Sequence, residues 1–140
     1  MPLAKGAILV DEFVLALNER SGVRVARTSI SQNVFEFRGK GKCLMYIKGR
    51  AEAPYRWGIT ANVVERLKRQ AQPWAVVLLF DCHESGYLLP ASDVTYYIQT
   101  IWPLAGDGDY KPATGSYLGR NAPLYSLEKF VTGIERLGNV

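Results

Sequence analysis

Apolar and polar positions alternate with two different periods along the chain, and these periods predict helices and strands. Residues 7–19 repeat polar side chains at helical spacing and predict a largely buried first helix. Residues 23–29 alternate Val and Arg with small residues between them, a period of two that predicts a strand. Residues 33–38 and 42–48 follow, joined by a Gly-Lys-Gly turn, and predict an antiparallel hairpin. The second hairpin strand is apolar at nearly every position, so we expect it at the centre of a sheet.

The second half of the chain alternates predicted helices with predicted strands. Thr60 is placed to cap a second helix, and residues 74–80 form the most strand-like run, without any charge. A short strand at 87–89 leads to a third helix capped by Ser92. Residues 104–125 are rich in Gly, Pro, Asp and Tyr without a period and predict a long loop. The predicted buried stripe of the second helix consists of Val63, Val64, Leu67 and Ala71.

A last helix, capped by Ser126 and ended by Gly138, completes the order of elements. The order is helix, three strands, helix, strand, short strand, helix, loop, helix. It predicts an α/β fold with a mixed central β-sheet flanked by helices on both faces. A chain of 140 residues accommodates one core, so we expect residues 1–140 to form a single domain. No apolar run approaches the ~20 residues that cross a bilayer, and the first residues lack the charge pattern of a secretory signal. We therefore expect a cytoplasmic protein without a membrane partner.

Cysteine, histidine and loop acids offer weak signals for chemistry. Cys43 and Cys82 lie in runs that predict strands, and we expect both to be buried free thiols. With a single histidine, His83, the two thiols do not complete a closed tetrahedral zinc site without carboxylates. Asp107 and Asp109 flank a glycine, as is ordinary in loops. None of these positions predicts a metal centre.

Positive charge is concentrated in one segment of the chain. Between Arg20 and Arg69 the sequence has twelve Lys or Arg and three acids, whereas the remainder has five Lys or Arg and ten acids. Such a polarised chain suits an anionic partner, and DNA or another nucleic acid is the commonest one. The alternative is a solvated sheet edge on which Lys and Arg prevent edge pairing. The candidate nucleic-acid-binding residues are Lys40, Lys42, Arg50, Arg56, Trp57, Arg66 and Arg69.

Residues 50–58 interleave basic and aromatic side chains directly after the second hairpin strand. Arginine and aromatic rings together can hold a phosphate backbone and stack on exposed bases. The alternative is a packed loop in which Tyr55 and Trp57 cover the end of the sheet. The sequence leaves both interpretations open.

The order of the first six elements and one lysine carry a resemblance to a known superfamily. Helix, three-strand meander, helix and strand is the core order of the restriction-endonuclease-like fold, and residues 8–89 resemble it. This PD-(D/E)XK superfamily includes archaeal Holliday-junction resolvases and places a (D/E)-X-K triplet on the third strand. Lys48 matches the lysine of the triplet, and a basic residue follows at Arg50. The first motif acid falls near Asn33 and the triplet acid falls on Tyr46, so both carboxylates are missing.

The resemblance implies a nuclease site, and the missing acids change what we expect of it. Active members hold Mg²⁺ with hard oxygen ligands, and the metal activates the attacking water. A tyrosine hydroxyl is a poor substitute for a carboxylate. Glu36, Glu52 and Glu12 are the acids that could move into a metal shell beside Lys48.

Three functions follow from these observations. We expect a nucleic-acid-binding domain of restriction-endonuclease-like fold that has lost catalysis and needs no cofactor. The first alternative is an active Mg²⁺-dependent endodeoxyribonuclease in which Lys48, Glu36 and Glu12 are catalytic with displaced carboxylates. The second alternative is a protein-interaction module without enzymatic activity. The sequence leaves open whether the chain forms a homodimer.

Overall fold

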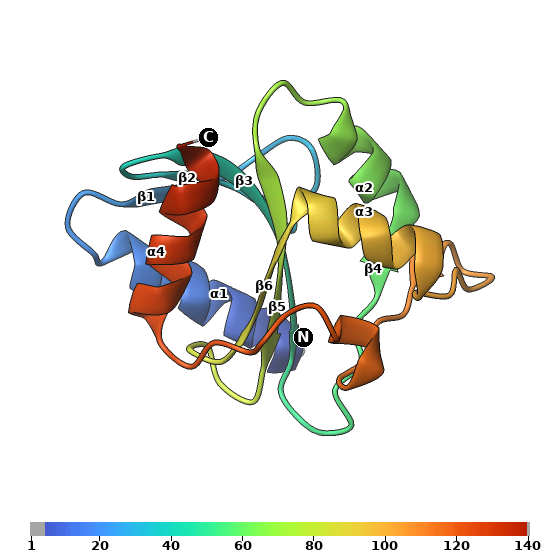
Figure 1. Cartoon of the computed structure of the whole chain (residues 1–140). Coiled ribbons are helices and arrows are strands. Elements are labelled where there is room, and N and C mark those ends of the chain that lie inside the picture. The colour runs from blue at the N-terminus through green and yellow to red at the C-terminus, as the bar shows by residue number, and fades with distance from the viewer. Residues whose placement is uncertain (1–4, 140) are drawn as a thin grey trace.

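The computed structural model describes residues 5–139 and has an α/β fold with a mixed five-stranded sheet (Figure 1). The helices are α1 (Lys5–Asn18), α2 (Ala61–Lys68), α3 (Ala91–Thr100) and α4 (Leu127–Gly138), with a short 3-10 helix η1 (Ser116–Leu118). The strands are β1 (Arg24–Arg27), β2 (Val34–Arg38), β3 (Lys42–Arg50), β4 (Ile59–Thr60), β5 (Trp74–Phe80), β6 (Gly86–Pro90) and β7 (Asp109–Tyr110). The predicted α/β fold class is confirmed, and the predicted helices and strands occur in the predicted order, with β4, β7 and η1 in addition.

The main sheet has the order β1-β2-β3-β5-β6, and β4 pairs with β7 separately. β1, β2 and β3 form an antiparallel meander, β3 and β5 are parallel, and β6 returns antiparallel to β5. The parallel pair needs a crossover connection, and α2 provides it. Every residue of β5 from Trp74 to Leu79 is buried, as its uninterrupted apolar sequence predicts.

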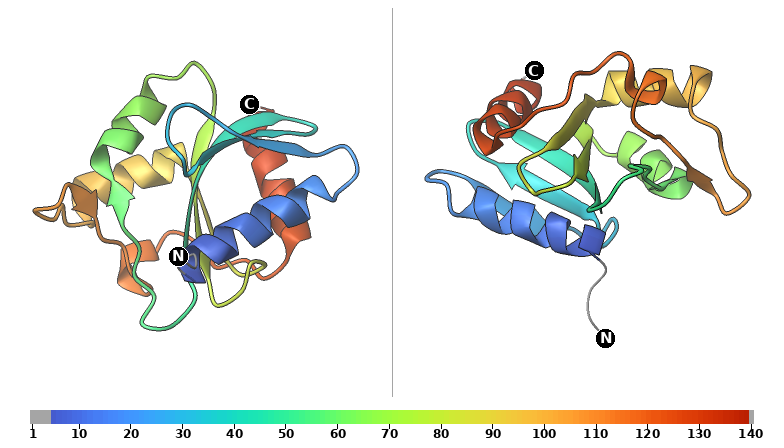
Figure 2. Two further views of the ribbon diagram at one scale, coloured as in Figure 1. Left: turned by 180° about the vertical axis from the view of Figure 1, so that it is seen from behind. Right: turned by 90° about the horizontal axis from the view of Figure 1, so that it is seen from below.

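Helices cover both faces of the sheet, and each face has its own hydrophobic core (Figure 2). α1 and α4 pack on one face, where Phe13 meets Phe130 edge to face with ring centroids 5.2 Å apart. α2 and α3 pack on the other face. Successive residues of β3 point to opposite faces, so Met45 belongs to the first core and Tyr46 to the second. Within residues 5–139, no helix is long and apolar enough to span a membrane.

Both edge strands of the sheet are partly covered by groups from outside it. The side chain of Asn18, at the end of α1, donates to the carbonyl of Val25 in β1 at 3.0 Å and accepts from its N–H at 2.7 Å. On the opposite edge, the backbone of Gly86 in β6 exchanges hydrogen bonds with Leu124. Pro90, which ends β6, has no N–H to offer. The middle of β1 and the start of β6 are therefore not open edges.

Several local predictions about the helices were wrong. α1 is half-buried rather than largely buried because it lies on the sheet surface, and Leu15 on its outer side is 61% exposed. Ala71 is exposed because α2 ends at Lys68, before that position. Thr60 makes no side-chain cap, and its N–H instead donates to the hydroxyl of Tyr46 at 3.1 Å. Ser92 lies inside α3, which begins directly after a proline.

The long loop after α3 contains structure that its composition does not reveal. β7 pairs with β4 inside it, and polar bonds attach its later part to α3. The N–H of Arg120 donates to the hydroxyl of Tyr97 at 2.9 Å, and the Asn121 amide donates to Asp93 at 3.0 Å. At the end of this segment the Ser126 hydroxyl accepts from the N–H of Lys129, which confirms the predicted cap of α4.

The two cysteines have different environments, so the prediction of two buried thiols is half wrong. Cys43 is fully buried in β3, and burial raises the pKa of its thiol to about 12. Cys82 is exposed because β5 ends at Phe80 and the chain turns at Asp81, whose φ of 67° is left-handed. The strand-like run before Cys82 therefore stops two residues short of it.

The buried thiol predicts a loss of stability at high pH. In the unfolded chain Cys43 loses its proton near its ordinary pKa of 9.0, whereas in the folded protein it keeps the proton until about pH 12. The folded state then binds more protons than the unfolded state, so the free energy of unfolding falls as the pH rises from 9 towards 12. Urea denaturation across this range should show a steeper decline for the native chain than for Cys43→Val. Equal slopes for the two proteins would contradict the assignment.

Candidate nucleic-acid interface

The predicted nucleic-acid-binding residues lie at opposite ends of the sheet. Lys42 begins β3 and Arg50 ends it, so the two are about 26 Å apart at the usual rise of a strand. Lys40 lies in the turn before β3, and Arg66 and Arg69 lie at the end of α2, which leads into the start of the parallel strand β5. One group therefore occupies the amino end of the β3–β5 pair. The other group, at the carboxyl end, consists of Arg50 and Arg56.

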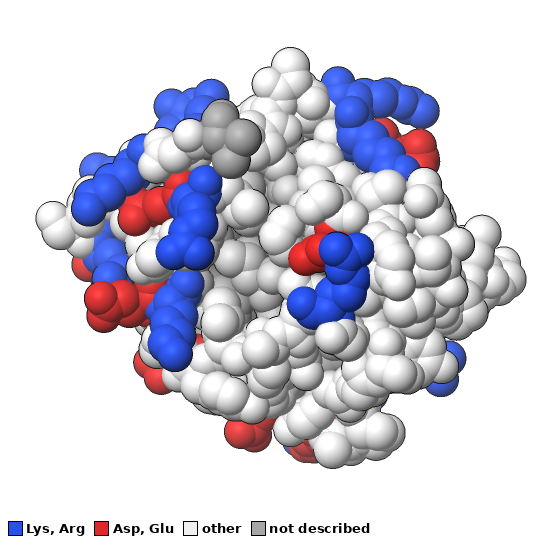
Figure 3. Space-filling model, viewed as in Figure 1, with Lys and Arg blue, Asp and Glu red and all other residues white. Residues whose placement is uncertain are grey.

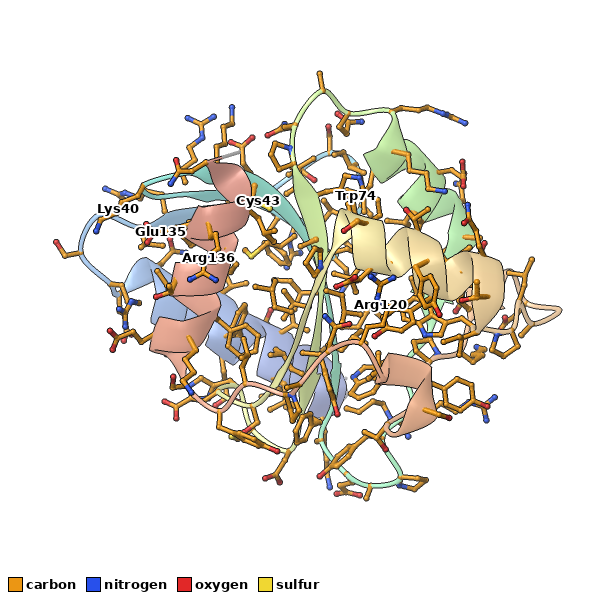
Figure 4. The ribbon with its side chains drawn as sticks, in the orientation of Figure 1. Lys40, Cys43, Trp74, Arg120, Glu135 and Arg136 are labelled. Carbon is orange, nitrogen blue, oxygen red and sulfur yellow. The ribbon has the colours of Figure 1, made fainter. Side chains whose placement is uncertain are left out.

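At the amino end, Glu36 compensates Arg38 and Lys42. The charged groups of the other candidates there, Lys40, Arg66 and Arg69, have no carboxylate within 4.0 Å among residues 5–139. Glu36 accepts from Arg38 at 2.6 Å and lies 3.6 Å from Lys42. Burial alone would raise the pKa of Glu36, but the hydrogen bond from Arg38 and the neighbouring charges lower it below its usual range. The backbone N–H of Lys40 donates to the Glu135 carboxylate at 2.7 Å, and Figure 4 shows the two residues beside each other at the end of α4.

At the carboxyl end, α1 lies directly on the backbone of β3. A Cβ atom placed on Gly49 would lie 2.5 Å from the carbonyl oxygen of Gly6, so only glycine permits this approach. Beside the contact is a cleft of about 450 Å³. The residues that line it are Lys5, Gly6, Ala7, Val10, Asn33, Lys48, Gly49, Arg50, Ala51 and Glu52. Gly6 and Gly49 both line this cleft, so their close contact brings α1 against β3 beside Lys48 and Arg50.

A second recess of about 400 Å³ shares Arg50 with the cleft. Arg56, Trp57, Gly58 and Lys111 complete its lining. Arg56 comes from the loop after β3, and this loop is held in place because Trp57 donates its backbone N–H to Pro112 at 2.9 Å. The two hollows therefore meet at the last residue of β3.

Three cations in these hollows have no acidic partner. Among residues 5–139, Lys48, Arg50 and Arg56 have no carboxylate within 4.0 Å. By contrast, Lys5 pairs with Glu52, and Lys111 pairs with Asp107 at 2.7 Å and Asp109 at 3.7 Å. The unpaired cations are available to an external anion.

The structure does not bring the candidate catalytic residues together. Glu36 is paired across the sheet with Leu44, four residues before Lys48 in β3. Glu12 lies on α1, and its carboxylate is 3.9 Å from His83. Of the three acids, Glu52 lines the cleft and is engaged by Lys5.

The two positions that the superfamily motif fills with acids have structural contacts instead. The Asn33 amide donates to the carbonyl of Ile47 at 3.1 Å, and Tyr46 is buried with its hydroxyl bound to the backbone of Thr60. In the part of the chain that the structure describes, no three His, Cys, Asp or Glu side chains are placed to hold a metal ion. Neither Asn33 nor Tyr46 supplies a carboxylate to a metal ion.

Trp57, one of the predicted nucleic-acid-binding residues, is packed inside the protein. Its side chain is 2% exposed, and its indole N–H donates to the carbonyl of Leu79 at 3.0 Å. The ring faces Tyr55 in a stacked arrangement and Tyr87 edge-on. This burial favours the packed-loop alternative for this residue.

One exposed aromatic residue at this end carries no signal in the sequence. Tyr125 precedes α4 and is 64% exposed, and its ring centroid lies 6.2 Å from that of Phe80. Phe80 is the last residue of β5 and lies opposite Arg50 in the parallel register. A separation of 75 residues between Arg50 and Tyr125 gives no local pattern to detect. Both residues lie at this end because β3 and β5 end side by side and Tyr125 packs against the last residue of β5.

Comparison with known proteins does not assign the chain to a family. No family model matches the sequence, and no curated protein is significantly similar to it. The restriction-endonuclease-like relationship stays a prediction that rests on the order of elements and on Lys48.

Proposed function

We propose that this protein binds nucleic acid through the carboxyl end of its β3–β5 pair and does not cleave it. The observation that carries the proposal is the set of three uncompensated cations, Lys48, Arg50 and Arg56, around two adjoining hollows. A cation without an intramolecular partner gives its full charge to a phosphate, and the release of condensed counterions then favours binding.

The distribution of charges and hollows favours the carboxyl end of the β3–β5 pair over the amino end as the binding surface. Figure 3 shows the face formed by α3, β6 and α4, where cations gather over α4 and at the end of α2 and a cluster of both signs lies over α3 near the centre. The cations at the amino end share their surroundings with Glu36 and Glu135. Unpaired cations are present at both ends, but at the carboxyl end Lys48, Arg50 and Arg56 line two adjoining hollows, an arrangement that can position a phosphate backbone.

The absence of cleavage follows from the chemistry of the cleft lining. Hydrolysis of a phosphodiester by this class of site needs carboxylates that fix a divalent metal ion and its water. Glu52 is the carboxylate residue of the cleft, and it is exposed and paired with Lys5. Lys48 alone can attract a phosphate but cannot activate a nucleophilic water in this way.

Salt-dependent binding tests the proposal. We expect duplex DNA to bind with an affinity that falls as salt rises, and Arg50→Gln/Arg56→Gln to reduce the slope of log K against log salt by about 1.8, for two phosphate contacts. The matched control is Arg66→Gln/Arg69→Gln, which removes the same charge from α2. Fluorescence anisotropy at several salt concentrations measures both slopes.

The outcomes separate the alternatives. If neither DNA nor RNA binds at low salt, the proposed function is wrong and a protein-interaction module becomes the better account. If the α2 variant loses the slope instead, the interface lies at the amino end. Incubation of the complexes with Mg²⁺ or Mn²⁺ should leave plasmid DNA intact, whereas cleavage that EDTA and Lys48→Ala abolish would establish a nuclease.

A further inference from the structure

Aromatic rings continue from the core to the surface at the carboxyl end of β5. Trp57 and Tyr87 are buried, Tyr55 and Phe80 are half-buried, and Tyr125 is 64% exposed. Neighbouring rings are in contact at each step, since the centroids of Tyr55 and Phe80 are 5.0 Å apart and those of Phe80 and Tyr125 are 6.2 Å apart. The series ends in one ring that is open to solvent.

The perpendicular orientation of Tyr125 leaves at least one face of its ring uncovered by Phe80. Its ring is perpendicular to that of Phe80, with an interplanar angle of 90°. An edge-to-face contact fixes an aromatic ring without stacking on both of its faces. Tyr96 is a useful contrast, because it is also exposed but the Arg120 guanidinium lies over its ring, 4.3 Å from the centroid.

The exposed ring is connected to the unpaired cations through Phe80 and Tyr55. Phe80 is the partner of Arg50 in the β3–β5 register, and Tyr55 precedes Arg56 in the loop. A nucleic-acid strand whose phosphates contact Arg50 and Arg56 would therefore pass beside Phe80 and Tyr125. In a duplex the faces of the bases are covered by their neighbours, whereas an unpaired base offers its face to a ring.

We propose that Tyr125 is a stacking residue for an unpaired base and that this site selects single-stranded nucleic acid over duplex. The proposal rests on the proposed function, since Arg50 and Arg56 hold the phosphates of the same strand. Phe80 and Tyr55 act as positioning residues that hold the Tyr125 ring at the rim. Stacking adds affinity for every base type, so the preference concerns strandedness rather than sequence.

Binding of two labelled probes tests this selectivity at one salt concentration. The probes are an oligothymidylate and the duplex that it forms with oligodeoxyadenylate. We expect the single strand to bind more tightly, and Tyr125→Ala to weaken its binding about tenfold while changing duplex binding less than about twofold. Tyr125→Phe keeps the ring and should retain the preference. Tyr96→Ala is the matched control, because it removes an exposed tyrosine whose face is already covered.

The results distinguish this proposal from the proposed function. If both probes bind equally and Tyr125→Ala changes neither, the selectivity is wrong while phosphate binding at Arg50 and Arg56 stands. If neither probe binds the native chain, both proposals are wrong. Melting temperatures of the variants exclude unfolding as the cause, since a largely exposed ring contributes little to the core. If Tyr125→Phe loses the preference as Tyr125→Ala does, the hydroxyl rather than the ring is responsible, and stacking is overturned.

Discussion

Replacing Gly49 with alanine is expected to lower the melting temperature by roughly 3 to 10 °C. The added Cβ would lie 2.5 Å from the carbonyl oxygen of Gly6 and 3.2 Å from the Cβ of Leu9. Two of the three nearest atoms belong to the backbone of Gly6. Because backbone atoms cannot rotate away, α1 must move away from β3 to remove the clash. That movement also separates the cleft walls, and we expect weaker binding of nucleic acid although neither charge beside Gly49 has changed.

Gly106→Ala is the matched control for this substitution. Gly106 has no atom within 4 Å of an added Cβ, and its φ lies outside the left-handed region. Its replacement should leave the melting temperature nearly unchanged or raise it slightly, because alanine restricts the unfolded chain. Differential scanning calorimetry compares the three proteins. A Gly49→Ala protein as stable as the native chain would show that the backbones of Gly6 and Gly49 are not in close contact.

Trp57→Ala is expected to destabilise the protein by about 3 to 5 kcal/mol, the usual cost of truncating a buried tryptophan. The indole fills the space between Tyr55 and Tyr87, and its N–H bond to Leu79 connects the loop to β5. Without it, residues 51–58 lose their anchor and Arg56 loses its position. Urea denaturation should show a lower midpoint.

Trp57→Phe separates the structural role of this residue from direct contact with nucleic acid. Phenylalanine keeps much of the buried area and loses one hydrogen bond, which costs about 0.5 to 1.5 kcal/mol. We expect this variant to fold and to bind nucleic acid almost as the native chain does. A folded Trp57→Phe protein with strongly impaired binding would mean that the indole itself touches the ligand.

The architecture could be predicted from the sequence because each element carries its own period. Val, Leu and Phe without interruption in β5, and the Gly-Lys-Gly turn between β2 and β3, determine these elements locally. The two-residue strands β4 and β7 could not be predicted in this way. Each forms because Ile59 and Tyr110 meet across the fold, and neither has a pattern of its own.

The candidate site was predictable only in part because its residues are brought together by strand ends. Arg50 and Arg56 were recognised from the local mixture of basic and aromatic residues. Lys42 was grouped with them although the full length of β3 separates it from Arg50. A count of charges along a sequence does not show at which end of a strand each charge lies. The exposure of Tyr125 and the burial of Trp57 could not be predicted for a related reason. Exposure of an aromatic ring depends on which distant residues pack around it.

Asn18 limits how far the sheet can extend. Its side-chain amide gives Val25 the donor and the acceptor that a neighbouring strand would give. Unlike a strand, the amide has no second row of backbone groups with which a further strand could pair. At the opposite edge, Leu124 and Pro90 have a similar effect on β6. A second copy therefore cannot continue the hydrogen-bond ladder at these points, which guards the protein against fibrils. At these points, copies of the chain can associate only through side-chain surfaces.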